Sequence, residues 1–97
     1  MKTIQTIGVI GGGTMGNGIA HVAARSGFKV LLHDLEQRFL DRSLQTIAKN
    51  LEREVAKSKI SEDEKSSALS RIVPVTKNSA LSEADFIIEA VVENFEN

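Results

Sequence analysis

Hydrophobic and polar residues alternate at the start of the chain and then recur at helical spacing. The alternation over Thr3–Ile10 predicts a strand. From Gly13 the period lengthens to about 3.6 residues, so a helix is predicted from there to just before Gly27, a C′ glycine. The predicted apolar stripe of this helix comprises Met15, Ile19, Val22 and Ala23. The run 28–34 predicts a second strand that ends in an acid, which completes a strand–helix–strand unit.

A long amphipathic helix is predicted from Glu36 to about Lys59. Its apolar residues recur every three or four positions and are Leu40, Leu44, Ile47, Leu51 and Val55. Ser61 and Glu64 have the spacing of a capping box, which predicts a second helix from there to about Arg71. The two helices therefore form a hairpin between the second and third strands.

Two further strands are predicted near the end of the chain. Ile72–Thr76 contains Pro74, which cannot donate a hydrogen bond and suits the edge of a sheet. After a polar turn or short helix at 78–84, the apolar run Phe86–Val92 predicts a strand covered on both faces. These elements indicate an α/β fold, a Rossmann-type doubly wound parallel sheet with the helical hairpin inserted between strands two and three. Strands five and six of that topology are absent, so residues 1–97 are expected to be an incomplete domain, truncated at its C-terminal side.

Composition and charge exclude several classes of function. The chain has 97 residues, 41% hydrophobic and 26% charged, which suits one globular domain. A net charge of −1 does not favour nucleic acid or an anionic membrane, and no apolar run approaches the ~18 residues of a membrane span. The absence of cysteine excludes disulfides and thiolate metal sites, and it fits a reducing compartment. A cytoplasmic location is therefore expected.

The strongest chemical signal is the spacing Gly11-x-Gly13-x-x-Gly16 between the first strand and the first helix. Glycines at this spacing allow a sharp turn, close approach of a pyrophosphate and tight helix packing. Asp34 follows 18 residues after Gly16, at a strand end where a carboxylate can accept hydrogen bonds from a ribose. A structural turn followed by a chance acid is the alternative. Asp34 favours NAD over NADP, because a carboxylate repels a 2′-phosphate, while FAD remains possible from the motif alone.

Other titratable residues give weaker signals. Glu89 and Glu93 flank the end of the fourth predicted strand, and a catalytic carboxylate pair is one interpretation of them. Solvated carboxylates, or an acid that contacts the cofactor, fit better because no partner acid or base is in view. His21 and His33 have no metal-ligand neighbour at useful spacing and are expected to be structural or surface residues. No catalytic residue and no metal site are predicted within residues 1–97.

A row of cations is expected on the long helix, opposite its apolar stripe. The row consists of Arg42, Lys49, Arg53 and Lys57. A solvated helix face is the usual meaning of such a row, and an anion-binding site is the alternative.

Two stretches resemble the N-terminal domain of 3-hydroxyacyl-CoA dehydrogenases, which include the 3-hydroxybutyryl-CoA dehydrogenases. They are the glycine turn at 8–20, which contains Thr14-Met15, and the run Ile-Ile-Glu-Ala-Val-Val-Glu-Asn at 87–94. The long helical hairpin also resembles this family, and the resemblance extends over essentially the whole chain. It implies NAD-dependent oxidation of the 3-hydroxyl of a 3-hydroxyacyl-CoA to a 3-ketoacyl-CoA, with hydride transfer to NAD, in fatty-acid or butanoate metabolism.

The resemblance also implies roles for individual residues. The implied cofactor-binding residues are Gly11, Gly13, Thr14, Met15 and Gly16 at the pyrophosphate, Asp34 at the ribose, and Glu93. Lys57 matches a lysine that contacts the CoA part of the substrate. Asn50 stands where many members have a CoA-contacting serine, and its polar side chain is expected to substitute for it.

In the resembling family the catalytic histidine, its glutamate partner and a C-terminal helical domain would all follow Asn97. The full-length protein is then expected to be a homodimer through that domain, and these residues alone are expected to be inactive. The implied ligands are NAD and an acyl-CoA, with no nucleic acid and no membrane. Two alternatives stay open: another NAD-dependent hydroxyacid dehydrogenase of similar fold, and a non-catalytic nucleotide-binding module.

Overall fold

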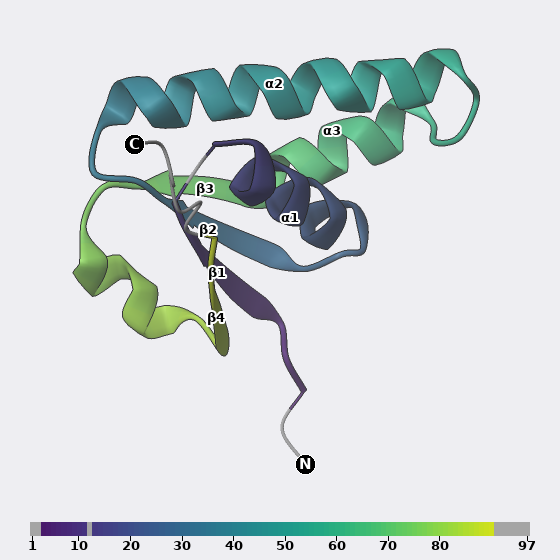
Figure 1. Ribbon diagram of the computed structural model, residues 1–97. Coiled ribbons are helices and arrows are strands. Elements are labelled where there is room, and N and C mark those ends of the chain that lie inside the picture. The colour runs from purple at the N-terminus through teal and green to yellow at the C-terminus, as the bar shows by residue number, and fades with distance from the viewer. Residues whose placement is uncertain (1–2, 12, 91–97) are drawn as a thin grey trace.

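Four parallel strands form one sheet in the structure, a computed structural model that describes residues 3–11 and 13–90. The elements are β1 (Thr6–Ile10), α1 (Gly13–Arg25), β2 (Lys29–His33), α2 (Gln37–Ala56), α3 (Glu62–Ser70), β3 (Ile72–Val75), the 3₁₀ helix η1 (Asn78–Glu83) and β4 (Phe86–Glu89). The strand order is β3-β2-β1-β4 (Figure 1). This order confirms the Rossmann-type α/β fold and the helical hairpin between the second and third strands.

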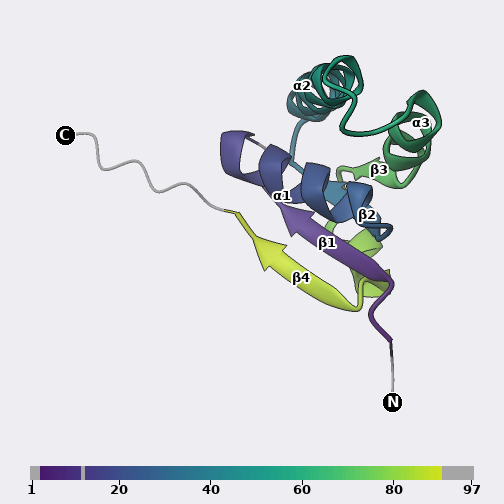
Figure 2. The ribbon, with the colours of Figure 1, turned by 90° about the vertical axis from the view of Figure 1, so that its right-hand side faces the viewer.

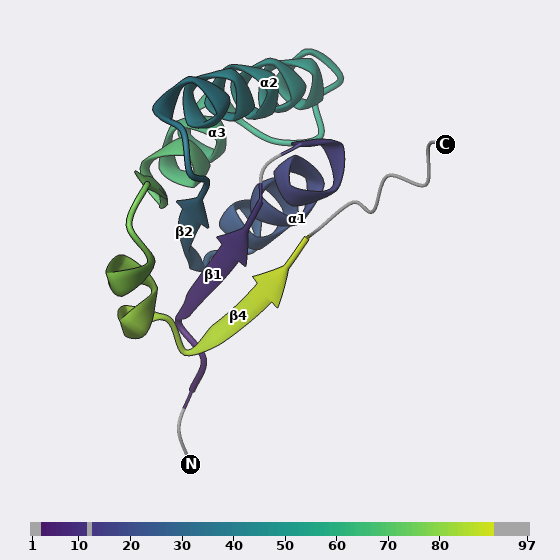
Figure 3. The same cartoon turned by 60° about the vertical axis from the view of Figure 1, so that its left-hand side comes forward.

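The carboxyl ends of β1, β2 and β4 meet at one edge of the sheet. Ile10, the last residue of β1, pairs with His33 at the end of β2 and with Glu89 at the end of β4. The last residues of these strands therefore lie side by side, although they are distant in sequence (Figure 3). Ligands of open parallel α/β sheets bind at this edge.

The helices α1, α2 and α3 lie on one side of the sheet, and η1 lies on the other (Figures 1 and 2). Successive residues of β1 point to opposite faces, as the pleat of a strand requires. Val9 belongs to the core that includes Ala20 of α1. Its neighbour Gly8 faces η1 so closely that a Cβ there would lie 3.1 Å from Cδ2 of Leu81.

The predicted apolar stripe of α1 is confirmed at Ile19 and Ala23, which contribute to the core, and is wrong at Met15 and Val22. Ala20, Ala23 and Ala24 are buried, whereas Met15 and Val22 are 53% and 62% exposed. The small side chains allow α1 to contact β1, β2, α2 and α3 at the same time. Met15 and Val22 are left on the side of the helix that the sheet and the hairpin do not cover.

The helical hairpin has the predicted packing. In α2, Leu40, Ile47 and Leu51 are fully buried, and Leu44 and Val55 pack against the same core. The helix ends at Ala56 rather than near Lys59, because Ser58 has a left-handed φ of 60°. The capping box at α3 is present, since Ser61 Oγ accepts from Glu64 N at 3.1 Å and Glu64 Oε1 accepts from Ser61 N at 2.8 Å.

The first strand is shorter than predicted. It begins at Thr6 rather than Thr3. The backbone N–H groups of Gln5 and Thr6 instead donate to Oδ2 of Asp85, at 2.9 and 3.0 Å. A side chain from the segment before β4 thus takes the place of a strand partner at this end.

The outer strands fit their predictions in part. β3 is an edge strand and contains Pro74, as predicted. The exposed fractions of Phe86 and Ile87 in β4 are 52% and 47%, so that strand is not covered on both faces as predicted. The reason is its position, because β4 is the outermost strand on that side within residues 3–11 and 13–90. β4 ends at Glu89, and residues 91–92 of the predicted strand lie outside the described residues.

Candidate functional site

The glycine turn connects the end of β1 to the first residue of α1. Gly11 and Gly13 have φ values of +90° and +71°, which side-chain-bearing residues rarely adopt. The turn is tied to the neighbouring strand, because Gly11 N donates to the carbonyl oxygen of His33 at 2.9 Å. The backbone conformation alone therefore requires glycine at positions 11 and 13, whether or not a ligand binds.

The same turn leaves room for a ligand at one glycine and none at another. A Cβ on Gly16 would lie 2.0 Å from the carbonyl oxygen of Gly11, so α1 packs against the turn with no space for a side chain. A Cβ on Gly13 would meet nothing within 4 Å. Gly13 is also the first residue of α1, whose N-terminal N–H groups and dipole favour an anion. This arrangement fits the pyrophosphate of a dinucleotide.

Asp34 follows β2 directly and lies at the same edge of the sheet. Its backbone N–H donates to the carbonyl oxygen of Val75 at 3.2 Å, which anchors it between β2 and β3. Its Oδ1 accepts from Glu36 N at 3.5 Å, and its side chain is partly exposed. Since β1 and β2 are adjacent, the carboxylate lies beside the strand end from which the glycine turn starts. This is the placement that ribose binding requires.

The other predicted cofactor residues are less well defined. Thr14 and Met15 lie in the first turn of α1, and Met15 is exposed. Nothing is described of the side chain of Thr14. Glu93 lies outside the described residues. Glu89, which the sequence paired with it, is exposed at the end of β4.

A cavity of about 520 Å³ lies between the start of α1 and the first half of α2. Its lining residues are Gly13, Asn17, Gly18, Phe39, Arg42, Ser43, Thr46 and Asn50. The structure thus brings Asn50, one of the two predicted CoA residues, to the same cavity as Gly13 of the cofactor turn. Lys57, the other, is the exposed C-cap residue of α2 and does not line it.

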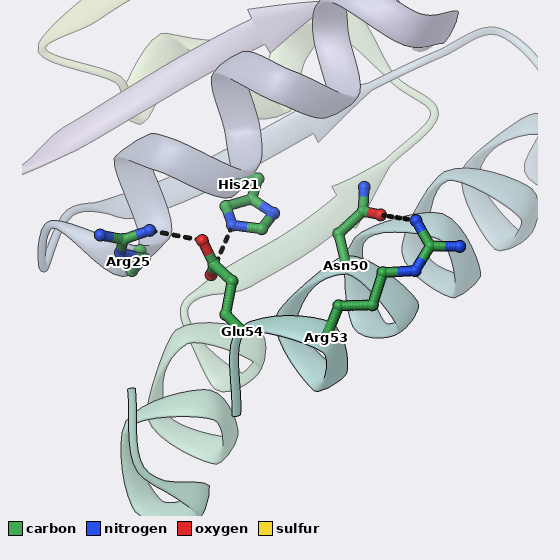
Figure 4. Close-up of polar contacts among 5 residues, drawn as sticks. All are labelled: His21, Arg25, Asn50, Arg53 and Glu54. Carbon is green, nitrogen blue, oxygen red and sulfur yellow. Dashed lines mark hydrogen bonds and ion pairs between the residues drawn. The ribbon is translucent and has the colours of Figure 1, made fainter. Parts of the chain in front are cut away.

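Sequence reasoning missed a polar cluster that joins α1 to α2. Nε2 of His21 lies 3.0 Å from Oε1 of Glu54, and Nη1 of Arg25 donates to Oε2 of the same carboxylate at 2.5 Å (Figure 4). His21 is therefore a partly buried structural residue. Its partner is 33 positions away, so no local spacing could reveal the pair. His33 is also structural, being buried in the sheet.

A second charged contact joins α2 to α3. The ammonium group of Lys65 donates a hydrogen bond to Oε2 of Glu52. This bond, and the attraction of the Glu52 and Glu62 carboxylates, raise the pKa of Lys65, while desolvation opposes them. Together with the Glu54 cluster, the contact ties α2 to both of its neighbouring helices.

No group of three His, Cys, Asp or Glu side chains within residues 3–11 and 13–90 could hold a metal ion. None of the described helices is both long and apolar enough to cross a membrane.

Comparison with known proteins identifies the family. Residues 6–97 match the family described as 3-hydroxyacyl-CoA dehydrogenase, NAD binding domain. The chain belongs to this family. The recognised motifs at 8–20 and 87–94 both fall within the matched residues, so the predicted membership is confirmed, and NAD is the cofactor that the family binds.

Individual relatives agree with this assignment. The chain is 48% identical over 93 residues to a 3-hydroxybutyryl-CoA dehydrogenase of Bradyrhizobium diazoefficiens, covering 96% of this chain and 32% of that protein. It is 43% identical to a 3-hydroxyadipyl-CoA dehydrogenase of Escherichia coli, covering 99% of this chain and 20% of that protein. The crystal structure of an (S)-3-hydroxybutyryl-CoA dehydrogenase from Ralstonia eutropha superimposes with a TM-score of 0.91 at 40% identity, covering 96% and 33% of the two chains. The chain thus spans a third or less of each of these proteins.

Proposed function

We propose that the protein containing this chain is an NAD-dependent 3-hydroxyacyl-CoA dehydrogenase. It oxidises the 3-hydroxyl of a 3-hydroxyacyl-CoA to a ketone and transfers the hydride to NAD. The observation that carries this proposal is the match of residues 6–97 to the NAD-binding domain of that family. The glycine turn and Asp34, side by side at one edge of the sheet, support it on independent physical grounds.

Each predicted site residue has a role in this proposal. The backbone of the turn at Gly11, Gly13 and Gly16, with Thr14 and Met15 beside it, binds the pyrophosphate of NAD. Asp34 accepts hydrogen bonds from the adenosine ribose, and Glu93 contacts the cofactor. Asn50 and Lys57 bind the CoA part of the substrate from α2. The open space at Gly13 and the cavity beside Asn50 support the first and last of these roles.

Residues 1–97 act in this proposal as the NAD-binding domain of a longer protein. The greater length of the relatives supports this organisation. We place the catalytic residues and a helical domain for homodimer formation in the remaining sequence, and the whole protein in the cytoplasm.

Two measurements on the whole protein test the proposal. Calorimetric titration should give binding of NAD and much weaker binding of NADP. Mixing the protein with NAD and 3-hydroxybutyryl-CoA should produce NADH, whereas free 3-hydroxybutyrate should not. Equal oxidation of the free acid would indicate another hydroxyacid dehydrogenase. Binding of NAD without oxidation of any 3-hydroxyacyl-CoA would indicate a non-catalytic nucleotide-binding module.

A further inference from the structure

Helices α1 and α2 face each other along two ridges of residues that recur at every fourth position. Side chains at this spacing line up along a helix, and helices pack through such ridges. The α1 ridge consists of Gly13, Asn17, His21 and Arg25, and the α2 ridge consists of Arg42, Thr46, Asn50 and Glu54. The first residues of the two ridges line one cavity, and the last residues contact each other.

The contact at the last residues of the ridges is made by one carboxylate. Nε2 of His21 lies 3.0 Å from Oε1 of Glu54, and Nη1 of Arg25 donates to Oε2 of Glu54 at 2.5 Å (Figure 4). The side chains of His21 and Glu54 are only 12% and 19% exposed, so water competes little for these bonds. This three-residue contact is the Glu54 clamp.

The clamp is directional, whereas the packing beneath it is not. Next to the ridges, α1 contributes the small residues Ala20 and Ala24 to the core, and α2 contributes Ile47 and Leu51. Burial of these apolar groups holds the two helices together, but it is non-directional. Hydrogen bonds to a carboxylate weaken steeply when their distance and angle change. The clamp therefore specifies the position of α2 along α1 more sharply than the apolar contacts do.

At the other end of the ridges, the cavity of about 520 Å³ lies between the two helices. Gly13, the first residue of α1, lines it from one helix, and Asn50 lines it from the other. Asn50 is one turn before Glu54 on α2. Glu54 itself does not line the cavity, so a substitution of Glu54 reaches the cavity only through the position of α2.

We propose that Glu54 is a positioning residue, which sets the separation between Asn50 and the glycine turn through its clamp. The inference rests on the proposed function, in which the turn binds NAD and α2 binds acyl-CoA. Each ligand then binds to a helix of its own, and the clamp fixes how the two ligands are placed relative to each other. Hydride transfer depends on that placement, since a displacement of about 1 Å can lower a rate about 100-fold. The clamp therefore affects the reaction more than it affects the binding of either ligand alone.

Binding and kinetics of Glu54→Ala in the whole protein test this inference. Calorimetry should give affinities for NAD alone and for acetoacetyl-CoA alone within about twofold of the wild type, because the residues that bind each ligand are unchanged. In contrast, kcat for oxidation of 3-hydroxybutyryl-CoA should fall about 10-fold. Glu54→Gln should recover most of this loss, since its amide oxygen can still accept from Arg25 and its NH₂ group can still bond to His21.

Arg25→Ala tests the same clamp from α1 and remains informative if Glu54→Ala does not fold. The Arg25 side chain is 46% exposed, so its removal leaves the buried part of the contact in place. Its kcat should fall less than that of Glu54→Ala, by about threefold, with both affinities again unchanged. In the double variant the two effects on kcat should not add, because both substitutions break one contact.

Two control variants separate positioning from lost stability and from lost charge. Ser61→Ala removes the N-cap of α3, which destabilises the protein away from the contact between α1 and α2. Glu52→Ala removes the same charge from α2 but no contact with α1. Both variants should keep the wild-type kcat at a temperature at which all the proteins are folded.

A wild-type kcat in both Glu54→Ala and Arg25→Ala would overturn the inference. An equal fall of kcat in Ser61→Ala would also overturn it, since the effect would then be one of stability. A loss of NAD affinity that accounts for the slower reaction would likewise exclude a positioning role. Failure of the proposed function has a different signature, because the wild type would then oxidise no 3-hydroxyacyl-CoA, and the inference would fall with it.

Discussion

His21 and Glu54 are 33 positions apart in the chain, and the imidazole Nε2 of one lies 3.0 Å from the carboxylate Oε1 of the other. Arg25 donates to the second oxygen of that carboxylate at 2.5 Å. His21 and Arg25 belong to α1, which follows the glycine turn, and Glu54 belongs to α2, which carries the row of cations. One carboxylate thus fixes the position of the proposed CoA-binding helix relative to the proposed pyrophosphate-binding helix.

Replacing Glu54 by alanine should destabilise the protein. The change leaves His21 partly buried without its partner and removes a charge-assisted hydrogen bond from Arg25. We expect the free energy of unfolding to fall by about 1–3 kcal/mol, measured by urea denaturation. Glu52→Ala is the control on the same helix, and it should have little effect because the Glu52 carboxylate is 54% exposed and can be solvated in its ion pair with Lys65. Equal losses in the two variants would contradict the structural role of Glu54.

Two glycines of α1 should respond to alanine in opposite ways. At Gly16 the new Cβ would lie 2.0 Å from the carbonyl oxygen of Gly11, so the turn must shift. We expect Gly16→Ala to lower the free energy of unfolding by about 1–3 kcal/mol and to weaken NAD binding. At Gly18 a Cβ meets nothing within 4 Å, and alanine should stabilise the helix by about 0.5–1 kcal/mol. Thermal unfolding and NAD titration of both variants check the pair, and a stable, NAD-binding Gly16→Ala protein would refute the packing described for the turn.

The fold could be predicted because its main signals are local in sequence. The stripe of α2 from Leu40 to Leu51 repeats at a period that only a helix produces, and the Ser61–Glu64 box marks where α3 begins. The face of α1 could not be predicted in this way. A hydrophobic stripe locates large apolar residues. The buried side of this helix instead contains the small residues Ala20 and Ala24, because only small side chains let α1 pack closely against its neighbouring elements.

The candidate site likewise contains parts that the sequence predicts and parts that it does not. The glycine turn and Asp34 are each encoded in a few adjacent residues, so their spacing predicted where they would lie. The contact of His21 with Glu54 depends on how two helices pack, and sequence spacing carries no information about it. The partners of the acidic side chains of α2, such as Lys65 for Glu52, likewise emerge only from the packed structure.

Asp34 should control the choice of cofactor. If its carboxylate accepts hydrogen bonds from the adenosine ribose, Asp34→Ala should weaken NAD binding by about 1.5–3 kcal/mol, roughly 10- to 150-fold. Binding of NADP should not weaken in parallel, because the same change removes the carboxylate that repels a 2′-phosphate. Calorimetric titration of the variant with both cofactors measures the two effects. Unchanged affinity for NAD would exclude Asp34 from the ribose site.

Lys57 should affect the acyl-CoA substrate and leave the cofactor alone. It is the C-cap residue of α2, seven positions after Asn50, so the two side chains lie on one flank of the helix about two turns apart. An exposed ammonium there can attract the phosphates of CoA as a point charge. Lys57→Ala in the whole protein should then raise KM for 3-hydroxybutyryl-CoA several-fold and leave the affinity for NAD unchanged.

Salt dependence separates such a contact from a general effect of charge. The attraction between Lys57 and a phosphate is screened by salt, so KM of the wild type should rise with ionic strength, and the rise should be smaller in Lys57→Ala. Lys59→Ala is the matched control, since it removes the same charge two positions on, beyond the left-handed turn at Ser58. The residue at 57 contacts CoA if only its own substitution raises KM and flattens the salt dependence. If the two variants behave alike, Lys57 is part of a solvated helix end.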